Sequence, residues 1–327
     1  MKSEELRNKI FEINSDKSFN EIALEIFHFQ YGNNPVYNQY VNLNNIRIKE
    51  IDHFKKIPFL PIELFKSHKV ICRDAEPEKI FLSSGTSGAE TSKHYVSDLR
   101  LYEKSFFTCF KKFYGNPDQY LILALLPSYL ERADSSLVYM VEKLIGLSKN
   151  VGSGFYLDNY DDLAKMLNRS ANQKVLLIGV TFALLEFAER YEIPLANGII
   201  METGGMKGRR KEIIREELHR VLCSKFHTNK IHSEYGMTEL LSQAYSQGNG
   251  IYKTPPWMKI LIRDTNDPKS LLDDYKSGGI NIIDLANLYS CSFIATQDLG
   301  KTNPDGSFEV LGRFDNSDIR GCNLMIQ

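Results

Sequence analysis

The chain has 327 residues, 43% of them hydrophobic and 25% charged, with a formal net charge of −1; this balance is typical of a soluble globular protein and gives no bulk attraction to nucleic acid or anionic membranes. The longest apolar runs, such as residues 121–126, fall far short of the roughly 20 residues that a membrane span needs, and the charged N-terminus lacks a signal-peptide core. Five scattered cysteines without a Cys-x-x-Cys pair argue against a disulfide scaffold or a structural zinc site, and they fit a reducing cytoplasm.

Apolar residues at helical spacing predict helices over residues 3–30, with a break and cap at residues 14–16. Residues 31–75 are rich in Asn, Tyr and Pro, which predicts irregular structure. From residue 76, short apolar strands alternate with amphipathic helices, which indicates α/β architecture with a largely parallel sheet. The expected strands are Lys79–Ser83, Tyr120–Leu126, Val175–Val180, Gly198–Met201 and Lys230–His232. The expected helices are Asp98–Phe113, Ser136–Leu147, Asp161–Asn168, Phe182–Tyr191 and Lys207–Cys223.

After residue 250 the pattern becomes rich in strands and turns, which suggests an antiparallel or barrel-like portion over residues 251–327. The expected strands there are Met258–Ile262, Gly279–Ile283 and Cys291–Ala295. No linker is long enough to require separate domains. The sequence therefore predicts a single domain over residues 1–327: a helical and irregular region (1–75), an α/β core (76–250) and the strand-rich portion (251–327).

A loop of small and hydroxyl-bearing residues follows the first expected strand; it contains Ser83, Ser84, Gly85, Thr86, Ser87 and Gly88. The two glycines lack Cβ atoms, so backbone N–H groups can turn toward an anion, and the hydroxyl groups add donors. Lys93 adds a positive charge that can meet phosphate. Because Ala89 follows Gly88, the loop is not a Walker A motif. The loop is suited to a polyphosphate, although a plain surface loop has the same composition.

Two later segments accompany this loop in the same order as in a known superfamily. The first is His232-Ser-Glu-Tyr-Gly-Met-Thr-Glu239, and the second runs from Ile294-Ala-Thr-Gln-Asp-Leu-Gly300 to Leu311-Gly-Arg-Phe-Asp315. Together the three segments resemble the adenylate-forming superfamily of acyl-CoA synthetases, luciferases and peptide-synthetase adenylation domains, over residues 80–322. The resemblance implies the large N-terminal domain of that superfamily, with mixed, largely parallel sheets, flanking helices and a strand-rich C-terminal portion. In the superfamily a small lid domain follows the Gly-Arg-x-Asp segment; here the chain ends twelve residues after Asp315, so the lid is expected to be absent.

The resemblance implies that ATP and Mg²⁺ bind along these segments. The first loop and Lys93 would hold the β- and γ-phosphates, and Thr238 would contact the α-phosphate. Glu239 would bind Mg²⁺, which needs few protein carboxylates when phosphate oxygens supply the rest. Tyr235 would stack on adenine, with Gly236 allowing the ring to approach the backbone. The local alternative is a strand-to-helix turn capped by Thr238.

Three more positions follow from the same resemblance. Gly204 and Gly205 match the wall of the adenine pocket, although a plain βα turn explains them equally well. Asp298 would accept the ribose hydroxyls; the superfamily usually has Gly before this Asp, where this chain has Gln297. Arg313 would contact the ribose or a phosphate, and a surface ion pair is its alternative.

The whole chain looks like a LuxE-type acyl-protein synthetase, the acid-activating component of the bacterial luminescence fatty-acid reductase. The supporting residues are the glycine-rich loop, the segment Leu126–Ser136 and the ending Asp318-Ile-Arg-Gly-Cys322-Asn-Leu. In that family the acyl group moves from acyl-AMP to a cysteine near the C-terminus, the position of Cys322, and then to the reductase. A thiolate can displace AMP from this mixed anhydride; the ordinary alternative for a lone cysteine is a small core hydrophobe. His232 and Ser128 are expected to line the acyl pocket.

These features predict an enzyme that activates a fatty or related carboxylic acid with ATP and passes it through Cys322 to an acceptor protein such as a reductase or carrier. The nearest alternative is an acyl- or aryl-CoA ligase resembling phenylacetate-CoA ligase, with CoA as the acceptor. An alternative of another class is a non-catalytic nucleotide- or acyl-binding subunit. No nucleic-acid partner and no membrane span are expected.

Overall fold

One large mixed sheet and one two-stranded hairpin organise the molecule. The computed structural model describes residues 2–83, 91–127, 134–157, 159–170, 172–195, 197–204 and 213–314. The strands of these residues are β1 (Leu60–Pro61), β2 (Lys79–Leu82), β3 (Lys93–Val96), β4 (Leu121–Leu125), β5 (Gly154–Tyr156), β6 (Val175–Val180), β7 (Ile199–Thr203), β8 (His232–Tyr235), β9 (Ala244–Ser246), β10 (Ile251–Lys253), β11 (Met258–Arg263), β12 (Gly278–Asp284), β13 (Phe293–Thr302) and β14 (Phe308–Arg313). The large sheet has the order β11-β12-β13-β14-β10-β9-β8-β7-β6-β4-β5, with β1 beside β13, and β2 pairs with β3.

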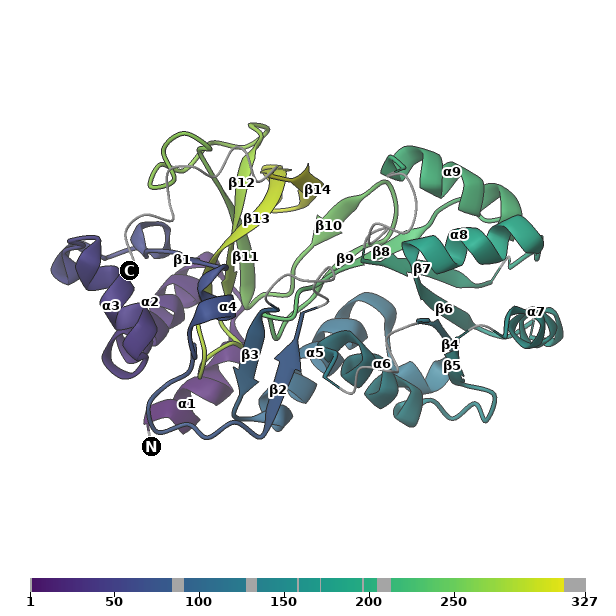
Figure 1. The fold of residues 1–327 in the computed structure, drawn as a ribbon, viewed down its shortest axis with the longest axis horizontal. Helices are drawn as coiled ribbons and strands as arrows, with labels where there is room; N and C mark the ends of the chain where they lie inside the picture. The colour runs from purple at the N-terminus through teal and green to yellow at the C-terminus, as the bar shows by residue number, and fades with distance from the viewer. Residues whose placement is uncertain are drawn as a thin grey trace.

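The α-helices of the described residues lie on both sides of this sheet and at one end of it (Figure 1). Helices α5 and α6 lie on one side of the parallel strands, and α8 and α9 lie on the other. The helices are α1 (Lys2–Lys9), α2 (Asp16–Asn33), α3 (Pro35–Leu43), α4 (Leu64–Ser67), α5 (Leu99–Tyr114), α6 (Ser136–Leu147), α7 (Tyr160–Arg169), α8 (Thr181–Arg190) and α9 (Arg215–Phe226). None of these helices is long and apolar enough to span a membrane.

The parallel part of the sheet comprises β5, β4, β6, β7 and β8. Strands β4 and β6 are buried at every position, because helices cover both faces of the sheet there. Their continuous apolar sequences, without polar alternation, are the pattern that such coverage requires. The predicted alternation of strands and helices is confirmed here, and α6 has the bounds that its sequence predicted.

Antiparallel pairing joins the remaining strands of the large sheet, apart from the parallel pair of β1 and β13. Strand β11 alternates buried and half-buried positions, so one of its faces packs inward. The N-terminal helices cover this end of the sheet: the rings of Phe27 in α2 and Phe293 in β13 meet edge to face, 6.4 Å apart. The α/β fold class with a strand-rich C-terminal portion is thereby confirmed.

Two local predictions fail for identifiable reasons. Irregular structure over residues 31–75 is wrong for Pro35–Leu43, which is α3: the Asn34 side chain accepts a hydrogen bond from the Tyr37 N–H, and Pro35 occupies the first turn, where no N–H is needed. Strand β8 runs from His232 to Tyr235 and not over the predicted Lys230–His232. The polar Glu234 within it accepts a hydrogen bond from Thr203 on β7, a long-range partner that the local pattern does not indicate. The division of one domain at residues 75 and 250 stays a prediction.

Candidate active site

The glycine-rich loop joins the two strands of the β2–β3 hairpin. The hairpin closes just before the loop: Ser83 N–H donates to the Ser92 carbonyl at 3.0 Å, and Ser92 N–H donates to Ser83 Oγ at 2.9 Å. These bonds place both ends of the loop side by side. The remaining predicted phosphate-loop residues lie outside the described residues; they are Ser84, Gly85, Thr86, Ser87 and Gly88.

Strand β3 presents Lys93 and His94 to opposite faces of the hairpin, as successive residues of a strand must. The side chain of Lys93 is exposed, whereas His94 is fully buried. His94 Nδ1 lies 2.7 Å from the carbonyl oxygen of Thr238. The hairpin that frames the glycine-rich loop therefore contacts the Thr238–Glu239 segment through the buried His94, while a phosphate contact of Lys93 stays a prediction.

Glu239 is a buried carboxylate, with 5% of its surface exposed. Burial raises its pKa, against a hydrogen bond from the Ser92 hydroxyl and the charge of Arg313, while the Asp298 charge raises it further. In the part of the chain that the structure describes, no cation forms an ion pair with Glu239, and no group of three acidic, His or Cys side chains could hold a metal by itself. A single buried carboxylate of this kind fits Mg²⁺ that takes its other ligands from phosphate and water.

Asp298 joins the second and third sequence segments. It lies on β13 opposite Arg313 on β14, whose Nε donates to Asp298 Oδ1 at 3.1 Å. The Tyr235 hydroxyl donates to Asp298 Oδ2 at 2.8 Å. The Tyr235 ring is largely buried and meets the rings of Tyr252 and Phe308 edge on. Residues predicted to contact the adenosine moiety and Mg²⁺ are thus brought together, while stacking of Tyr235 on adenine stays a prediction.

Gly236 and Glu234 are coupled sterically. Gly236 is exposed, and a Cβ at this position would collide with Oε1 of Glu234. The other carboxylate oxygen of Glu234 accepts a hydrogen bond from the Thr203 hydroxyl on β7. A larger residue at position 236 would therefore have to displace the Glu234 carboxylate, and the surface at Gly236 stays exposed.

We expect Glu234 to make stability depend on pH. Burial raises the pKa of Glu234 to about 7, against the Thr203 hydrogen bond. A folded-state pKa above the unfolded value means that stability is lost as pH rises from about 4.5 through 7, by on the order of 3 kcal/mol at pH 8. Glu234→Gln should flatten this decline in urea unfolding measured from pH 4 to 8. Glu217→Gln, on the exposed face of α9, is the control; equal pH slopes for parent and Glu234→Gln would contradict the prediction.

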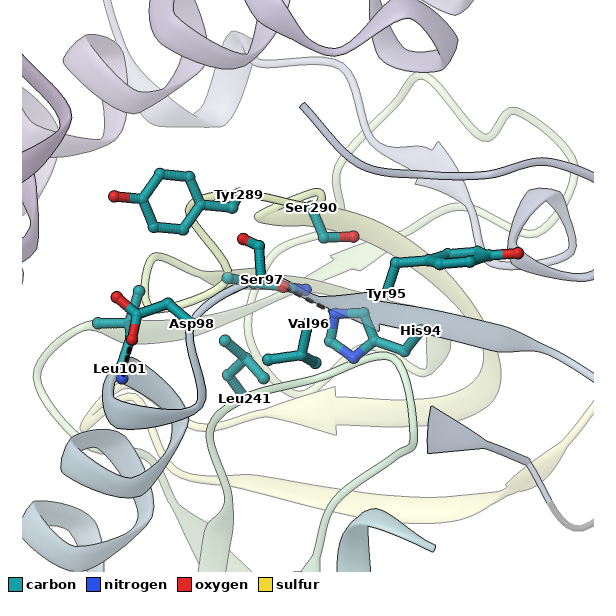
Figure 2. A pocket seen from close by; sticks show the side chains of 10 residues that line it. His94, Tyr95, Val96, Ser97, Asp98, Leu101, Leu241, Tyr289 and Ser290 are labelled. Atoms are coloured by element: carbon teal, nitrogen blue, oxygen red, sulfur yellow. Dashed lines mark hydrogen bonds between the residues drawn. The ribbon is translucent and has the colours of Figure 1, made fainter. Parts of the chain in front are cut away.

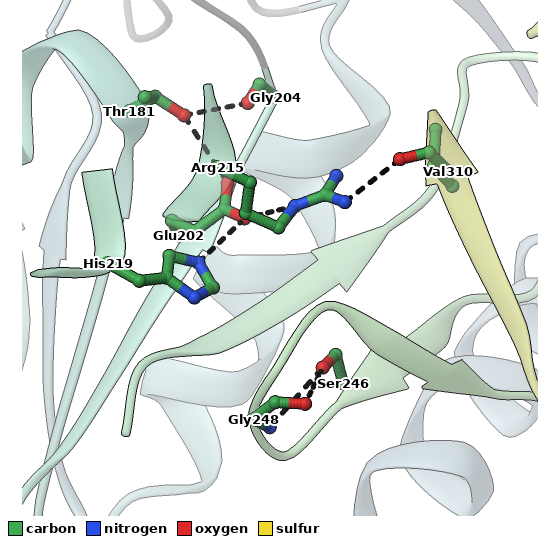
Figure 3. A network of polar contacts seen from close by, with 8 residues as sticks. All are labelled: Thr181, Glu202, Gly204, Arg215, His219, Ser246, Gly248 and Val310. Carbon is green, nitrogen blue, oxygen red and sulfur yellow. Dashed lines mark hydrogen bonds and ion pairs between the residues drawn. The ribbon is translucent and has the colours of Figure 1, made fainter. Parts of the chain in front are cut away.

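Gly204 ends β7 in a left-handed conformation, with φ +68°. Its carbonyl accepts a hydrogen bond from the Thr181 hydroxyl at 2.8 Å, and the same hydroxyl donates to Glu202 at 3.3 Å. Glu202 lies beside Arg215 and His219 of α9 (Figure 3). Its Oε1 is 3.9 Å from Arg215 Nε and 3.7 Å from His219 Nε2. Arg215 also donates to the Val310 carbonyl of β14 at 2.9 Å. Gly204 thus lies in an exposed turn after β7, where the Thr181 hydroxyl holds it.

Four of the predicted site residues remain: three lie outside the described residues, and the fourth is buried. Gly205, Ser128 and Cys322 lie outside the described residues. His232, expected in the acyl pocket, is buried, with Nδ1 3.3 Å from the Tyr114 hydroxyl. Burial and the Lys230 charge lower the pKa of His232 to about 4, so its ring is neutral at pH 7. Its role toward a substrate stays a prediction.

Sequence reasoning missed two residues at the end of β12 and in the loop that follows it. Asp284 accepts hydrogen bonds from the N–H groups of Leu241 and Ser242, at 2.8 and 2.9 Å. Asn287 donates to the Glu239 carbonyl at 2.8 Å. Both side chains hold the segment that follows Thr238. The available signal was weak, because polar residues after a strand usually indicate only a turn.

The fold is shared with adenylate-forming ligases of known structure. The ATP-bound MatB of Rhodopseudomonas palustris superposes with a TM-score of 0.57 and 18% identity over 74% of this chain and 49% of MatB. The 2-hydroxyisobutyryl-CoA ligase in complex with 2-HIB-AMP and CoA gives 0.67 and 11% over 92% and 70%. The luciferase-like enzyme of the mealworm Zophobas morio gives 0.51 and 15% over 77% and 61%. The chain thus spans about half the length of MatB.

A family model describes the chain more specifically. The model of LuxE, acyl-protein synthetase, matches residues 7–327. The chain therefore belongs to the LuxE family of acyl-protein synthetases. Comparison with curated protein sequences gives no significant match.

Proposed function

We propose that this protein activates a carboxylic acid with ATP to form acyl-AMP. One observation supports this reaction best: the ends of the glycine-rich loop, the Thr238–Glu239 segment and the Asp298–Arg313 pair meet in one place. Family membership and the likeness to ligases solved with ATP or with an acyl adenylate support the same reaction. A fatty or related acid is the proposed substrate class.

In the proposed reaction, a carboxylate oxygen of the acid attacks the α-phosphorus of ATP. The bond between this phosphorus and the bridging oxygen breaks, and pyrophosphate leaves with the electron pair. Two anions must meet, so the protein supplies preorganised hydrogen-bond donors rather than a strong base. Thr238 would donate to the α-phosphate, the serine and threonine hydroxyls of the hairpin loop to the other phosphates, and Asp298 would accept from the ribose. Mg²⁺ held by Glu239 would reduce the negative charge of the triphosphate when bound.

The second proposed step transfers the acyl group to Cys322. The thiolate sulfur attacks the acyl carbon, the bond from this carbon to the AMP oxygen breaks, and AMP leaves. The resulting thioester would then pass its acyl group to an acceptor protein, a reductase or a carrier. The four cysteines within the described residues are free thiols, which supports a reducing, cytoplasmic setting for this chemistry.

Exchange of labelled pyrophosphate into ATP tests the first step. Exchange should require both Mg²⁺ and a carboxylic acid, and a panel of acids of different chain length and aromaticity should identify the preferred class. If ATP raises the melting temperature of the protein but no acid supports exchange, the protein is instead a non-catalytic nucleotide-binding subunit.

CoA as the final acceptor is the second candidate, favoured by the likeness to a CoA ligase solved with CoA. The two acceptors give different products. After incubation with a radiolabelled acid and ATP, an acyl-protein synthetase carries label on the protein, whereas a CoA ligase releases labelled acyl-CoA when CoA is added. Loss of protein-bound label together with acyl-CoA formation would favour the CoA ligase.

A further inference from the structure

A buried polar pair bridges β3, the Thr238–Glu239 segment and the loop after β12. His94 and Asn287 are both buried, and His94 Nε2 lies 3.0 Å from Asn287 Oδ1. The other ring nitrogen of His94 lies 2.7 Å from the Thr238 carbonyl, which can only accept, so Nδ1 carries a proton. Burial lowers the pKa of His94 to about 4, so the ring is neutral and has a single N–H. Because Asn287 Oδ1 also only accepts, the ring donates to one of the two oxygens, and the shorter contact assigns this hydrogen bond to the Thr238 carbonyl.

Asn287 holds the next carbonyl along the chain. Its amide Nδ2 donates to the Glu239 carbonyl at 2.8 Å and to the Cys291 carbonyl at 2.9 Å. Two successive carbonyls, those of Thr238 and Glu239, are therefore fixed by two side chains that also contact each other. Fixing the peptide planes on both sides of Glu239 restricts the directions in which the Thr238 and Glu239 side chains leave the backbone.

The pair is itself anchored in the interior. The Gln30 amide of α2 donates to the Asn287 carbonyl at 3.0 Å, and Gln30 Oε1 accepts from Ser292 N–H at 3.0 Å. Figure 2 shows the His94 ring beside Val96 and Leu241, at a small cavity that Asn287 also lines. Packing of this kind leaves the ring few alternative orientations.

We propose that His94 and Asn287 are positioning residues that hold the Thr238 hydroxyl and the Glu239 carboxylate in place for MgATP. The proposal rests on the proposed function, because it assigns those two groups to the nucleotide and its metal. Ser92, which is bonded to Ser83 at the base of the glycine-rich loop, lies two residues before His94, so the same pair also couples the base of the loop to the Thr238–Glu239 segment. Removing a side chain that hydrogen-bonds to a metal ligand and orients it typically lowers metal affinity roughly 10- to 100-fold.

The test is a Mg²⁺ titration at fixed ATP, read both by thermal stabilisation and by acid-dependent pyrophosphate exchange. His94→Ala and Asn287→Ala should raise the half-saturating Mg²⁺ concentration about tenfold or more in both measurements. His94→Asn keeps an N–H near the position of Nδ1 and should recover most of the loss. Asn287→Asp replaces the donating amide with a carboxylate oxygen facing two carbonyls, and it should be worse than Asn287→Ala.

Tyr37→Phe is the matched control, because it removes one buried donor to a backbone carbonyl (that of Pro58, at 2.7 Å) away from this segment. It should lower stability and leave the Mg²⁺ titration unchanged. Folded His94 and Asn287 variants with the parent Mg²⁺ requirement would overturn the proposal, as would His94→Asn behaving like His94→Ala. If the parent binds MgATP without exchange, the proposed function fails, while thermal stabilisation still decides the positioning role. A parent that does not bind MgATP at all overturns both.

Discussion

Replacing Glu239 with Gln should lower the rate of Mg²⁺-dependent pyrophosphate exchange about a hundredfold or more. The unliganded protein should stay at least as stable as the parent. The loss follows because the neutral amide cannot offset the charge of Mg²⁺ beside the triphosphate. The retained stability follows because burial raises the pKa of Glu239. A folded-state pKa above the unfolded value means that ionisation costs stability at neutral pH, and Gln removes that cost.

The two expected effects have opposite signs, which separates a ligand-binding carboxylate from a structural one. Exchange would be measured at saturating ATP over a range of Mg²⁺ concentrations, and stability by thermal unfolding without ligands at pH 7. Glu192→Gln is a suitable control, because Glu192 is an exposed carboxylate paired with Lys225 and His227. A Glu239→Gln protein with near-parental exchange would remove Glu239 from the metal site, and a marked fall in its melting temperature would indicate a structural role.

Local sequence patterns predicted the buried strands and amphipathic helices because their signals lie within one element. The apolar run of β6 and the helical spacing of α5 need no distant partner to be recognised. The ordered motifs likewise indicated which segments meet. The tie between His94 and Asn287 joins residues 193 positions apart, and no periodicity encodes it. A side chain that holds another residue in place has no motif of its own, which is why Asn287 was missed.

Lys93 and His94 show that local sequence also fails to indicate which of two neighbouring residues is buried. A lysine after a glycine-rich loop is the obvious phosphate ligand from composition alone. Which of the two neighbours is buried depends on the pairing of β3 with β2, where Lys93 lies opposite Leu82; a phosphate contact of the exposed Lys93 stays a prediction. A shift of one residue would exchange the two faces. Register therefore decides that His94 is buried against the Thr238 carbonyl and that Lys93 is left exposed.

The thiols that the structure describes are poor candidates for an acyl carrier. Burial raises the pKa of Cys72 and of Cys291 to about 12, and it raises the pKa of Cys109 as well. Cys223, at the half-buried face of α9, also has a raised pKa. A thiolate is the nucleophile toward a mixed anhydride, so a thiol held protonated reacts slowly. Cys322 lies outside the described residues and stays the proposed carrier.

Cys322→Ser should therefore eliminate the label that a radiolabelled acid leaves on the protein, while pyrophosphate exchange continues. The first reaction needs only the nucleotide site, and the second needs a thiolate; a serine hydroxyl at neutral pH is too weak a nucleophile without a base beside it. The label should resist acid and be released by hydroxylamine, as expected for a thioester. Cys223→Ser is the matched control and should retain the label. Undiminished labelling of Cys322→Ser would exclude Cys322 as the carrier, and loss of the label in Cys223→Ser would move the assignment to α9.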